Sequence, residues 1–191
     1  MNFLEEKIKA EGQVFEGNVM KIDNFLNHQV DVSIIRKLAE DIKNHFEKVD
    51  VTKILTIESS GIPIATILAE LYSVPMVFAK KSQTVNSTDD QYISRAYSFT
   101  HETTNNVYVS RPYINSNDKV LIVDDFLADG EATRALIDIV HQAGAEVAGI
   151  GIAVEKGMHH TDERLRADGY RLHSVAVIQS MDPTTQTITF R

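Results

Sequence analysis

Short apolar runs recur along the middle of the chain and predict a series of strands. The clearest of them, residues 120–123, is apolar at four consecutive positions and rich in β-branched residues. Such a run is typical of a strand that is buried on both faces, as in a parallel sheet. Further strands are predicted at 51–57, 74–79 and 147–155.

Helical spacing of apolar residues predicts helices between these strands. A stripe covers residues 35–49 after Asp31, which can cap the helix start, and another covers 132–143 before Gly144, a typical C-cap position. Residues 62–72 are apolar nearly all round, which predicts a buried helix. The alternation predicts an α/β fold, with a central parallel sheet and helices on both faces.

The two ends of the chain show a weaker pattern. Residues 13–30 lack a strong periodicity, while the other terminal segments predict short helices at 2–11 and 162–167 and strands at 170–179 and 185–190. We predict one domain over residues 1–191. Within it, residues 1–30 and 157–191 are expected to form a small hood subdomain over the edge of the sheet.

A polar segment interrupts the apolar pattern in the middle of the chain. Residues 82–91 are the most polar part of the sequence and predict a mobile loop. Residues 93–99 and 107–111 then predict two strands, joined by a polar turn at 101–106.

Composition narrows the possible classes of protein. The 191 residues are 43% hydrophobic and 24% charged, as in ordinary globular proteins, and no apolar run approaches membrane-spanning length. The absence of cysteine and of a signal peptide predicts a cytoplasmic protein with no membrane partner. The net charge of −8 argues against nucleic-acid binding, and it requires local groups to hold any anionic substrate.

The segment 119–133, K-V-L-I-V-D-D-F-L-A-D-G-E-A-T, combines a strand, two acids, a small-residue turn and a helix start. Backbone N–H groups of such a turn can bind a phosphate, and Asp124 and Asp125 can accept hydrogen bonds from ribose hydroxyls or hold hydrated Mg²⁺. An acidic loop that caps an ordinary strand–helix unit explains the spacing equally well. A Walker P-loop is disfavoured, because Gly130 is followed by Glu-Ala-Thr.

The run V-D-D-F-L-A-D-G-E-A-T resembles the binding signature for phosphoribosyl pyrophosphate (PRPP) of type I phosphoribosyltransferases. Nearly the whole chain is similar to purine-specific members, through F-L-N-H-Q near residue 25, E-S-S-G-I at 58, Y-S-F-T at 97 and G-I-G-I-A-V-E-K at 149. The resemblance implies the type I phosphoribosyltransferase fold with a flexible lid loop. It also implies a homodimer and Mg²⁺ bound with PRPP and pyrophosphate.

The implied reaction transfers the 5-phosphoribosyl group of PRPP to N9 of a 6-oxopurine in purine salvage. Xanthine is the expected base, giving XMP and pyrophosphate, with guanine and hypoxanthine as alternatives. A PRPP-sensing transcriptional regulator on the same fold is an alternative of a different class. It would need a DNA-binding module and a basic surface. The acidic net charge and the short first helix of this chain argue against both.

The resemblance also assigns residues to sites. The implied catalytic residues are Asp124 and Asp125; the implied PRPP-binding residues are Ala128, Asp129, Gly130, Glu131, Ala132 and Thr133; the implied pyrophosphate-binding residues are Ser59, Ser60, Gly61, Lys80 and Lys81; and the implied xanthine-binding residues are Met20, Asn27 and Lys156. From the residues alone, a plain strand–helix turn is the preferred interpretation of 58–61, and a solvated strand end is that of the paired lysines.

The implied base site has a chemical rationale. In purine members of the 6-oxo type, a lysine at the place of Lys156 donates to O6, and such a donor rejects the 6-amino group of adenine. The amide of Asn27 can donate to O2 of xanthine or accept from the 2-amino group of guanine. Without the resemblance, Lys156 predicts a salt bridge to Glu155, Asn27 a turn, and Met20 a core position.

One position departs from the related enzymes. Hypoxanthine–guanine members carry a third acid in the PRPP loop, proposed to assist at N7 of the base, and Ala128 stands at that place. Asp129 follows it and is a candidate, but the group at N7 stays unassigned. We interpret His28, His159 and His160 as surface or turn residues, because no carboxylate spacing supports a metal site.

Overall fold

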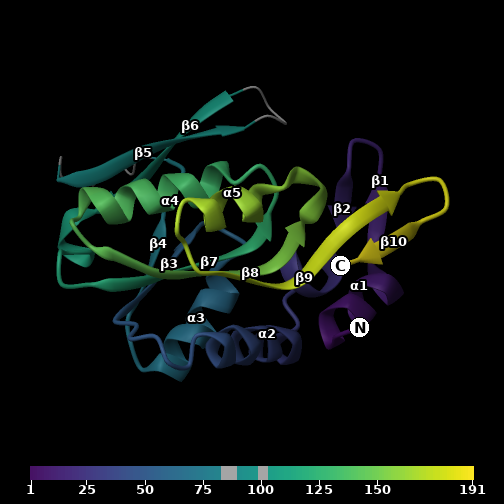
Figure 1. The fold of residues 1–191 in the computed structure, drawn as a ribbon, viewed down its shortest axis with the longest axis horizontal. Helices are drawn as coiled ribbons and strands as arrows, with labels where there is room; N and C mark the ends of the chain where they lie inside the picture. The colour runs from purple at the N-terminus through teal and green to yellow at the C-terminus, as the bar shows by residue number, and fades with distance from the viewer. Residues whose placement is uncertain (83–89, 99–102) are drawn as a thin grey trace.

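A computed structural model describes residues 1–82, 90–98 and 103–191 of the chain (Figure 1). Most of the predicted loop at 82–91, and with it the expected lid, lies outside the described residues. The same is true of residues 101 and 102 in the predicted turn.

A six-stranded sheet forms the centre of the molecule, in the order β10-β9-β8-β7-β3-β4. Every adjacent pair is parallel except β10 and β9, which are antiparallel. The predicted parallel sheet is therefore confirmed. Its strands are β3 (Lys53–Ile57), β4 (Met76–Ala79), β7 (Lys119–Leu127), β8 (Glu146–Lys156), β9 (Leu172–Asp182) and β10 (Thr187–Phe190).

Helices cover both faces of the sheet, as predicted. In Figure 1, α2 (Val32–His45) and α3 (Ile62–Tyr72) lie below it, and α4 (Glu131–Gln142) and α5 (Thr161–Ala167) lie above it. Successive side chains of a strand point to opposite faces. Accordingly Val123 of β7 packs with the α2–α3 cluster, whereas its neighbour Ile122 packs with the α4 cluster, and both are fully buried. The continuous apolar run at 120–123 follows from this double burial.

Strand β7 is longer than the apolar run predicted. It continues through both acids to Leu127, because Phe126 and Leu127 pair with Val154 and Glu155 of β8. The prediction that the strand ends at the two acids was wrong. The neighbouring strand supplies ladder partners that the sequence of β7 alone does not reveal.

A separate hairpin, β5 (Gln91–Ser98) and β6 (Thr103–Ser110), lies alongside α4 (Figure 1). The second strand begins earlier than predicted, and the polar turn at 101–106 was placed too late, because residues up to Asn106 pair with β5. Gln142 of α4 donates to the carbonyl of Ile93 at 2.8 Å, which attaches the hairpin to the helix. A short 3₁₀ turn, Arg111–Tyr113, follows.

The two ends of the chain meet beyond one end of the sheet. Helix α1 (Phe3–Glu11) is capped by Asn2 through a capping box. It is followed by a small hairpin of β1 (Gln13–Phe15) and β2 (Val19–Lys21) and by a π-helix, Asp23–Asn27. The sequence pattern did not predict these last three elements.

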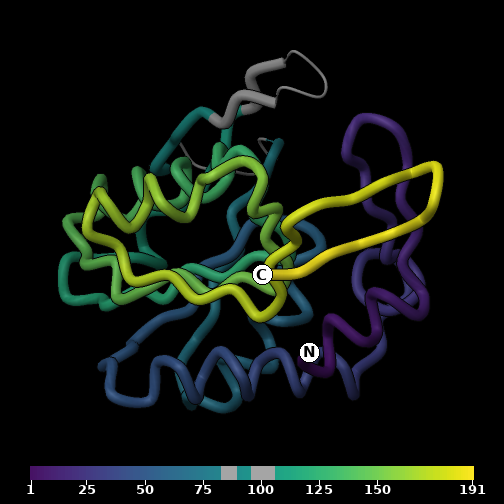
Figure 2. The backbone as a smooth tube through the Cα atoms, turned by 45° about the vertical axis from the view of Figure 1, so that its right-hand side comes forward, coloured from purple at the N-terminus to yellow at the C-terminus, as the bar shows by residue number. Residues whose placement is uncertain are grey.

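Contacts far apart in sequence hold this region together. Figure 2 shows the β1–β2 segment (purple) beside the β9–β10 hairpin (yellow). The amide of Gln186 donates to the carbonyl of Val14 at 2.8 Å and accepts from its N–H at 2.9 Å. The assignment of residues 1–30 and 157–191 to a hood subdomain stays a prediction. Within the described part of the chain, no helix has the length and apolarity that crossing a membrane requires.

Candidate functional site

The carboxyl ends of β3, β7 and β8 meet at one edge of the sheet, where ligands of open α/β sheets bind. Asp124 of β7 is only 5% exposed there, and its Oδ1 accepts the N–H of Asp125 at 3.0 Å. Burial, and next the negative charge of Asp125, raise the pKa of Asp124 well above its ordinary value, while the ammonium of Lys81 acts against that rise. A ligand with hydroxyl donors would favour the ionised carboxylate at this position.

The turn after β7 has the geometry of a phosphate cradle. Gly130 has φ +85°, and α4 begins at the next residue, so the N–H groups at the N-terminus of the helix point toward the turn. A Cβ on Gly130 would lie 2.5 Å from Cγ2 of Thr161. The Thr161 hydroxyl donates to the carbonyl of Ala128 at 2.6 Å, and Thr133, in the first turn of α4, is buried. The turn is therefore held from behind by α5.

The β3–α3 turn lies against the same acid. A Cβ on Gly61 would lie 3.0 Å from Oδ1 of Asp124 and still closer to the Thr56 hydroxyl, so only glycine fits there without a shift. The Glu58–Ser59 peptide bond of this turn is cis. The predicted pyrophosphate residues 59–61 are thus brought next to the predicted ribose acids. The Thr56 hydroxyl, which the sequence pattern did not single out, is buried here with no hydrogen-bond partner among the described residues.

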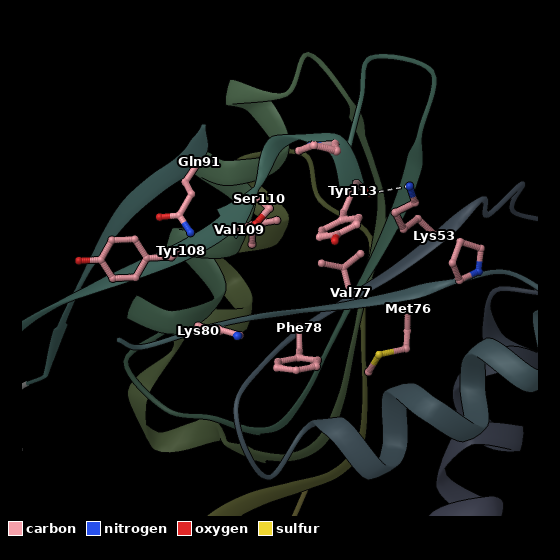
Figure 3. A pocket seen from close by; sticks show the side chains of 12 residues that line it. Lys53, Met76, Val77, Phe78, Lys80, Gln91, Tyr108, Val109, Ser110 and Tyr113 are labelled. Carbon is pink, nitrogen blue, oxygen red and sulfur yellow. Dashed lines mark hydrogen bonds between the residues drawn. The ribbon is translucent and has the colours of Figure 1, made fainter. Parts of the chain in front are cut away.

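The two neighbouring lysines face different surroundings. Lys81 is exposed, and its positive charge reaches Asp124. Lys80 instead lines a cavity of about 490 Å³ between β4, the β5–β6 hairpin and the 3₁₀ turn, together with Phe78 and Tyr108 (Figure 3). Of the two lysines, Lys81 therefore acts electrostatically on Asp124, whereas Lys80 faces the cavity.

Lys156 ends β8 and connects the sheet edge with the hood. Its Nζ donates to the carbonyl of Asn18 in the β1–β2 turn at 2.9 Å and lies 5.9 Å from the ring centroid of Phe126. Burial lowers the pKa of Lys156, and the carboxylate of Asp129 opposes this effect. Glu155 accepts from the Ser174 hydroxyl and pairs with Arg191, so no described contact supports the alternative of a Lys156–Glu155 salt bridge.

The two remaining base-site candidates come from the hood. Met20 on β2 is 8% exposed and belongs to the core cluster below the sheet, in line with its interpretation as a core residue. Asn27 ends the π-helix, and its Oδ1 is buried without a hydrogen-bond partner among the residues described. A buried amide oxygen without a partner is expected where a ligand completes the hydrogen bonding.

Two functional candidates were missed by sequence reasoning. Phe126 presents an aromatic ring near the Lys156 ammonium, and its only signal was an aromatic residue directly after the two acids. His159, interpreted as a turn residue, contacts Asp129 of the candidate PRPP turn, with Nδ1 and Oδ1 2.7 Å apart. His28 and His160 are exposed, as expected.

The acidic side chains at this edge of the sheet are of the type that can contact a metal ion. Among the described residues, no group of three or more histidine or acidic side chains is arranged to hold a metal ion. Asp124 and Asp125 nevertheless supply carboxylate oxygens, the type of ligand that Mg²⁺ prefers. The site therefore fits Mg²⁺ that arrives with a polyphosphate ligand and is contacted from one side by these acids.

Comparisons with known proteins show the family of the chain. Residues 21–181 match the family model of the phosphoribosyl transferase domain. A xanthine phosphoribosyltransferase of Bifidobacterium longum is 50% identical over 192 residues and covers 100% of both chains. One from Lachnoclostridium phytofermentans is 46% identical and covers 100% of this chain and 98% of its own.

Solved structures show the same fold at low sequence identity. Adenine phosphoribosyltransferase from Rhodothermus marinus superposes with a TM-score of 0.74 at 23% identity, covering 91% of this chain and 97% of its own. The enzyme from Trypanosoma brucei gives a TM-score of 0.76 at 16% identity, covering 92% and 79%. Fold and site thus define an α/β transferase of the type I class. The chain belongs to the phosphoribosyltransferase family.

Proposed function

We propose that the protein is a xanthine phosphoribosyltransferase, which transfers the 5-phosphoribosyl group of PRPP to N9 of xanthine and releases XMP and pyrophosphate. The observation that carries the proposal is the close approach of Gly61, in the 59–61 turn, to the buried Asp124, on the strand that continues into the glycine turn before α4. The 59–61 turn suits the pyrophosphate, and the 128–130 turn suits the 5′-phosphate. Asp124 and Asp125 suit the ribose that connects these two groups. The full-length relatives at 46–50% identity favour xanthine as the base.

Positioning and charge stabilisation supply the catalysis in this proposal. Asp124 and Asp125 accept hydrogen bonds from the ribose hydroxyls, and backbone N–H groups of residues 128–132 with the Thr133 hydroxyl bind the 5′-phosphate. Residues 59–61 and Lys81 bind the pyrophosphate, toward which charge develops as its bond to C1′ breaks. Lys80 joins them only if its side chain turns out of the cavity in Figure 3. Bound Mg²⁺ would supply neutralisation of the departing pyrophosphate.

The base is recognised by residues of the sheet and the hood together. Lys156 donates to O6, Asn27 hydrogen-bonds at C2, and Met20 and Phe126 provide apolar contact to the flat ring. The Lys156 ammonium already lies near Phe126 and the hood turn, which supports a binding slot between them. A donor at O6 disfavours adenine, because two donors would face each other.

Quaternary structure and location complete the proposal. We propose a homodimer in the cytoplasm. The absence of cysteine is compatible with a reducing compartment. The edge strand β4 carries an exposed Phe78, and the nearby Tyr113 is 60% exposed, which supports this side as a subunit contact. Light scattering of the purified chain should give twice the monomer mass of 21.4 kDa.

The test is turnover of PRPP with four bases measured side by side. Xanthine should give the highest kcat/KM, guanine and hypoxanthine lower values, and adenine the lowest. A preference for adenine would contradict the role of Lys156. A preference for guanine would favour guanine as the substrate base and would not contradict the proposed PRPP site. Absence of turnover with all four bases, in a folded protein that binds PRPP, would overturn the enzymatic assignment.

A further inference from the structure

The hydroxyl of Thr56 is buried beside the candidate site without a hydrogen-bond partner. Thr56 lies on β3, its side chain is fully buried, and its Oγ1 has no partner among the residues that the structure describes. Burying a hydroxyl in this way costs free energy unless a hydrogen bond compensates for the lost water. Such a group needs a reason to be there.

The position of Thr56 in the sheet explains its shape but not its hydroxyl. Ile54, two residues earlier on the same face of β3, is fully buried in the cluster that includes residues of α2 and α3. Leu55 and Ile57 point to the opposite face and belong to the α4 cluster. On this apolar face, valine would supply the same branched side chain without an unpaired hydroxyl.

The Thr56 hydroxyl and the Asp124 carboxyl group approach the same point, the place where Gly61 would carry a Cβ. That point lies 3.0 Å from Oδ1 of Asp124 and closer still to Oγ1 of Thr56. The three residues come from β3, from the turn after it and from β7, which pairs with β3. Because Gly61 has no side chain, it leaves open the space between the hydroxyl and the carboxyl group.

The carboxyl group of Asp124 can use a further donor. Among the described residues, the N–H of Asp125 donates to its Oδ1 at 3.0 Å, and an ionised carboxylate can accept several more hydrogen bonds. The group is 5% exposed and lies next to a second acid, so its negative charge is costly until donors reach it. A ligand supplies donors from the solvent side, whereas the fully buried Thr56 can supply one from within the protein.

We propose that Thr56 is a positioning residue of the PRPP site, whose hydroxyl donates to the ionised carboxylate of Asp124 when ribose hydroxyls bind there. The two side chains are not hydrogen-bonded in this structure, so the step needs a rotation for which Gly61 leaves the space. The new bond holds the carboxylate from behind and offsets part of the cost of its charge. This inference rests on the proposed function and extends it to a residue that does not touch the substrate.

Two substitutions at Thr56 separate the hydroxyl from the packing. Thr56→Val keeps the branched shape, so the unliganded protein should resist urea at least as well as the wild type. The Kd of PRPP, measured by calorimetry, should nevertheless rise about tenfold, the effect of losing one hydrogen bond to a charged group. Thr56→Ser keeps the hydroxyl and loses a methyl group, so it should be less stable to urea but bind PRPP within about threefold of the wild type. A purely structural role would make the loss of binding follow the loss of stability.

Thr66→Val is the matched control for the chemical change. Thr66 is exposed on α3, and its hydroxyl donates to the carbonyl of Ile62 in the same helix at 2.8 Å. The control should leave the Kd of PRPP unchanged. A double-mutant cycle then tests whether Thr56 acts through Asp124. Because the amide of Asp124→Asn carries no charge, the effect of Thr56→Val on the Kd should shrink to less than about threefold in that background.

Three outcomes would overturn the inference. They are a Thr56→Val variant that binds PRPP as tightly as the wild type, a loss of binding that persists undiminished in the Asp124→Asn background, and binding that follows urea stability in both Thr56 variants. The wild type is first assayed with PRPP and the 6-oxopurines, which separates this inference from the proposed function. Normal wild-type turnover together with normal binding by Thr56→Val refutes the inference alone. A folded wild type that neither binds nor turns over PRPP refutes the proposed function and the inference with it.

Discussion

At the scale of single residues, Asp124 shows how binding and stability oppose each other. Its carboxyl group is buried beside a second acid, and both effects favour the protonated form. Accepting a hydrogen bond from a ribose hydroxyl, the role proposed for Asp124, favours the ionised form. The residue is therefore costly to the empty protein and useful only when a ligand is present, a trade-off that is common in active sites.

Asp124→Asn should separate these two effects. Because the raised pKa means that the folded state binds the proton more tightly, stability of the wild type should fall as pH rises from the ordinary value of 3.8 through the raised value. The amide removes this part of the pH dependence, so the variant should be at least as stable at neutral pH. Its kcat/KM for PRPP should fall about 10–100-fold, the loss of one charge-assisted hydrogen bond.

The measurements are urea unfolding from pH 4 to 8 and steady-state kinetics. Asp138→Asn is the control, since Asp138 is an exposed carboxylate on α4 whose partner is Gln142. Full activity of a folded Asp124→Asn variant would refute the ribose role.

Base selection is the second residue-scale prediction. Lys156→Met should weaken kcat/KM for every 6-oxopurine by about 1.5–3 kcal/mol, the scale of a hydrogen bond to a charged group. Asn27→Ala should weaken xanthine more than hypoxanthine, because only xanthine has an oxygen at C2. Both variants are assayed by kcat/KM on both bases. Equal losses from Asn27→Ala would show that Asn27 does not recognise C2.

At the scale of elements, the turn between β7 and α4 depends on one glycine. Gly130 combines a positive φ with the close approach of Thr161, and these two requirements can be tested apart. Gly17 has a similar φ of +77°, but a Cβ added there would meet nothing within 4 Å. It supplies the matched control.

Gly130→Ala should raise the KM for PRPP about tenfold and cost about 1–3 kcal/mol of stability, because strain and clash both displace the turn. Gly17→Ala should have a similar backbone strain and leave the KM unchanged. Adding Thr161→Ser to Gly130→Ala removes the opposing methyl but keeps the hydroxyl, and should recover part of the PRPP binding. Unaltered PRPP saturation in folded Gly130→Ala would contradict the cradle.

At the scale of the whole molecule, the base site that we propose is divided between the sheet and the predicted hood. Lys156 comes from β8, whereas Met20 lies on β2 of the first hairpin and Asn27 in the π-helix after it. The hairpin is held through Gln186, which makes two hydrogen bonds to Val14. Substitutions in the predicted hood, far from the reacting atoms, should therefore change the KM for the base and leave the KM for PRPP unchanged.

Gln186→Asn tests this division. The shorter amide tolerates the φ of +54° but cannot span to Val14, which costs about 1–3 kcal/mol for two hydrogen bonds. The KM for xanthine should rise several-fold, and the KM for PRPP should change less than about twofold. Gln179→Asn, at an exposed position of β9, makes the same chemical change and should affect neither. A parallel rise of both KM values in Gln186→Asn would mean that hood and sheet are not separable.

Elements whose signals are local could be predicted from the amino-acid sequence alone. Helix caps at Asp31 and Gly144, the apolar stripes of α2 and α4, and the continuous run of β7 all depend on neighbours within a few residues. A parallel sheet with helices on both faces follows from their alternation. The order of strand, acids, turn and helix was likewise predictable, because all four lie in one continuous segment of the chain.

Features that depend on pairing between distant segments could not be predicted and became visible in the folded chain. The extension of β7 to Leu127 required β8, and the start of β6 required β5. The different surroundings of Lys80 and Lys81 follow from the pairing of Lys80 with Tyr108 of the β5–β6 hairpin. The contact of Asp129 with His159 spans 30 residues and exists because α5 packs behind the phosphate turn. Such contacts are set by the packing of whole elements, which no local pattern of residues encodes.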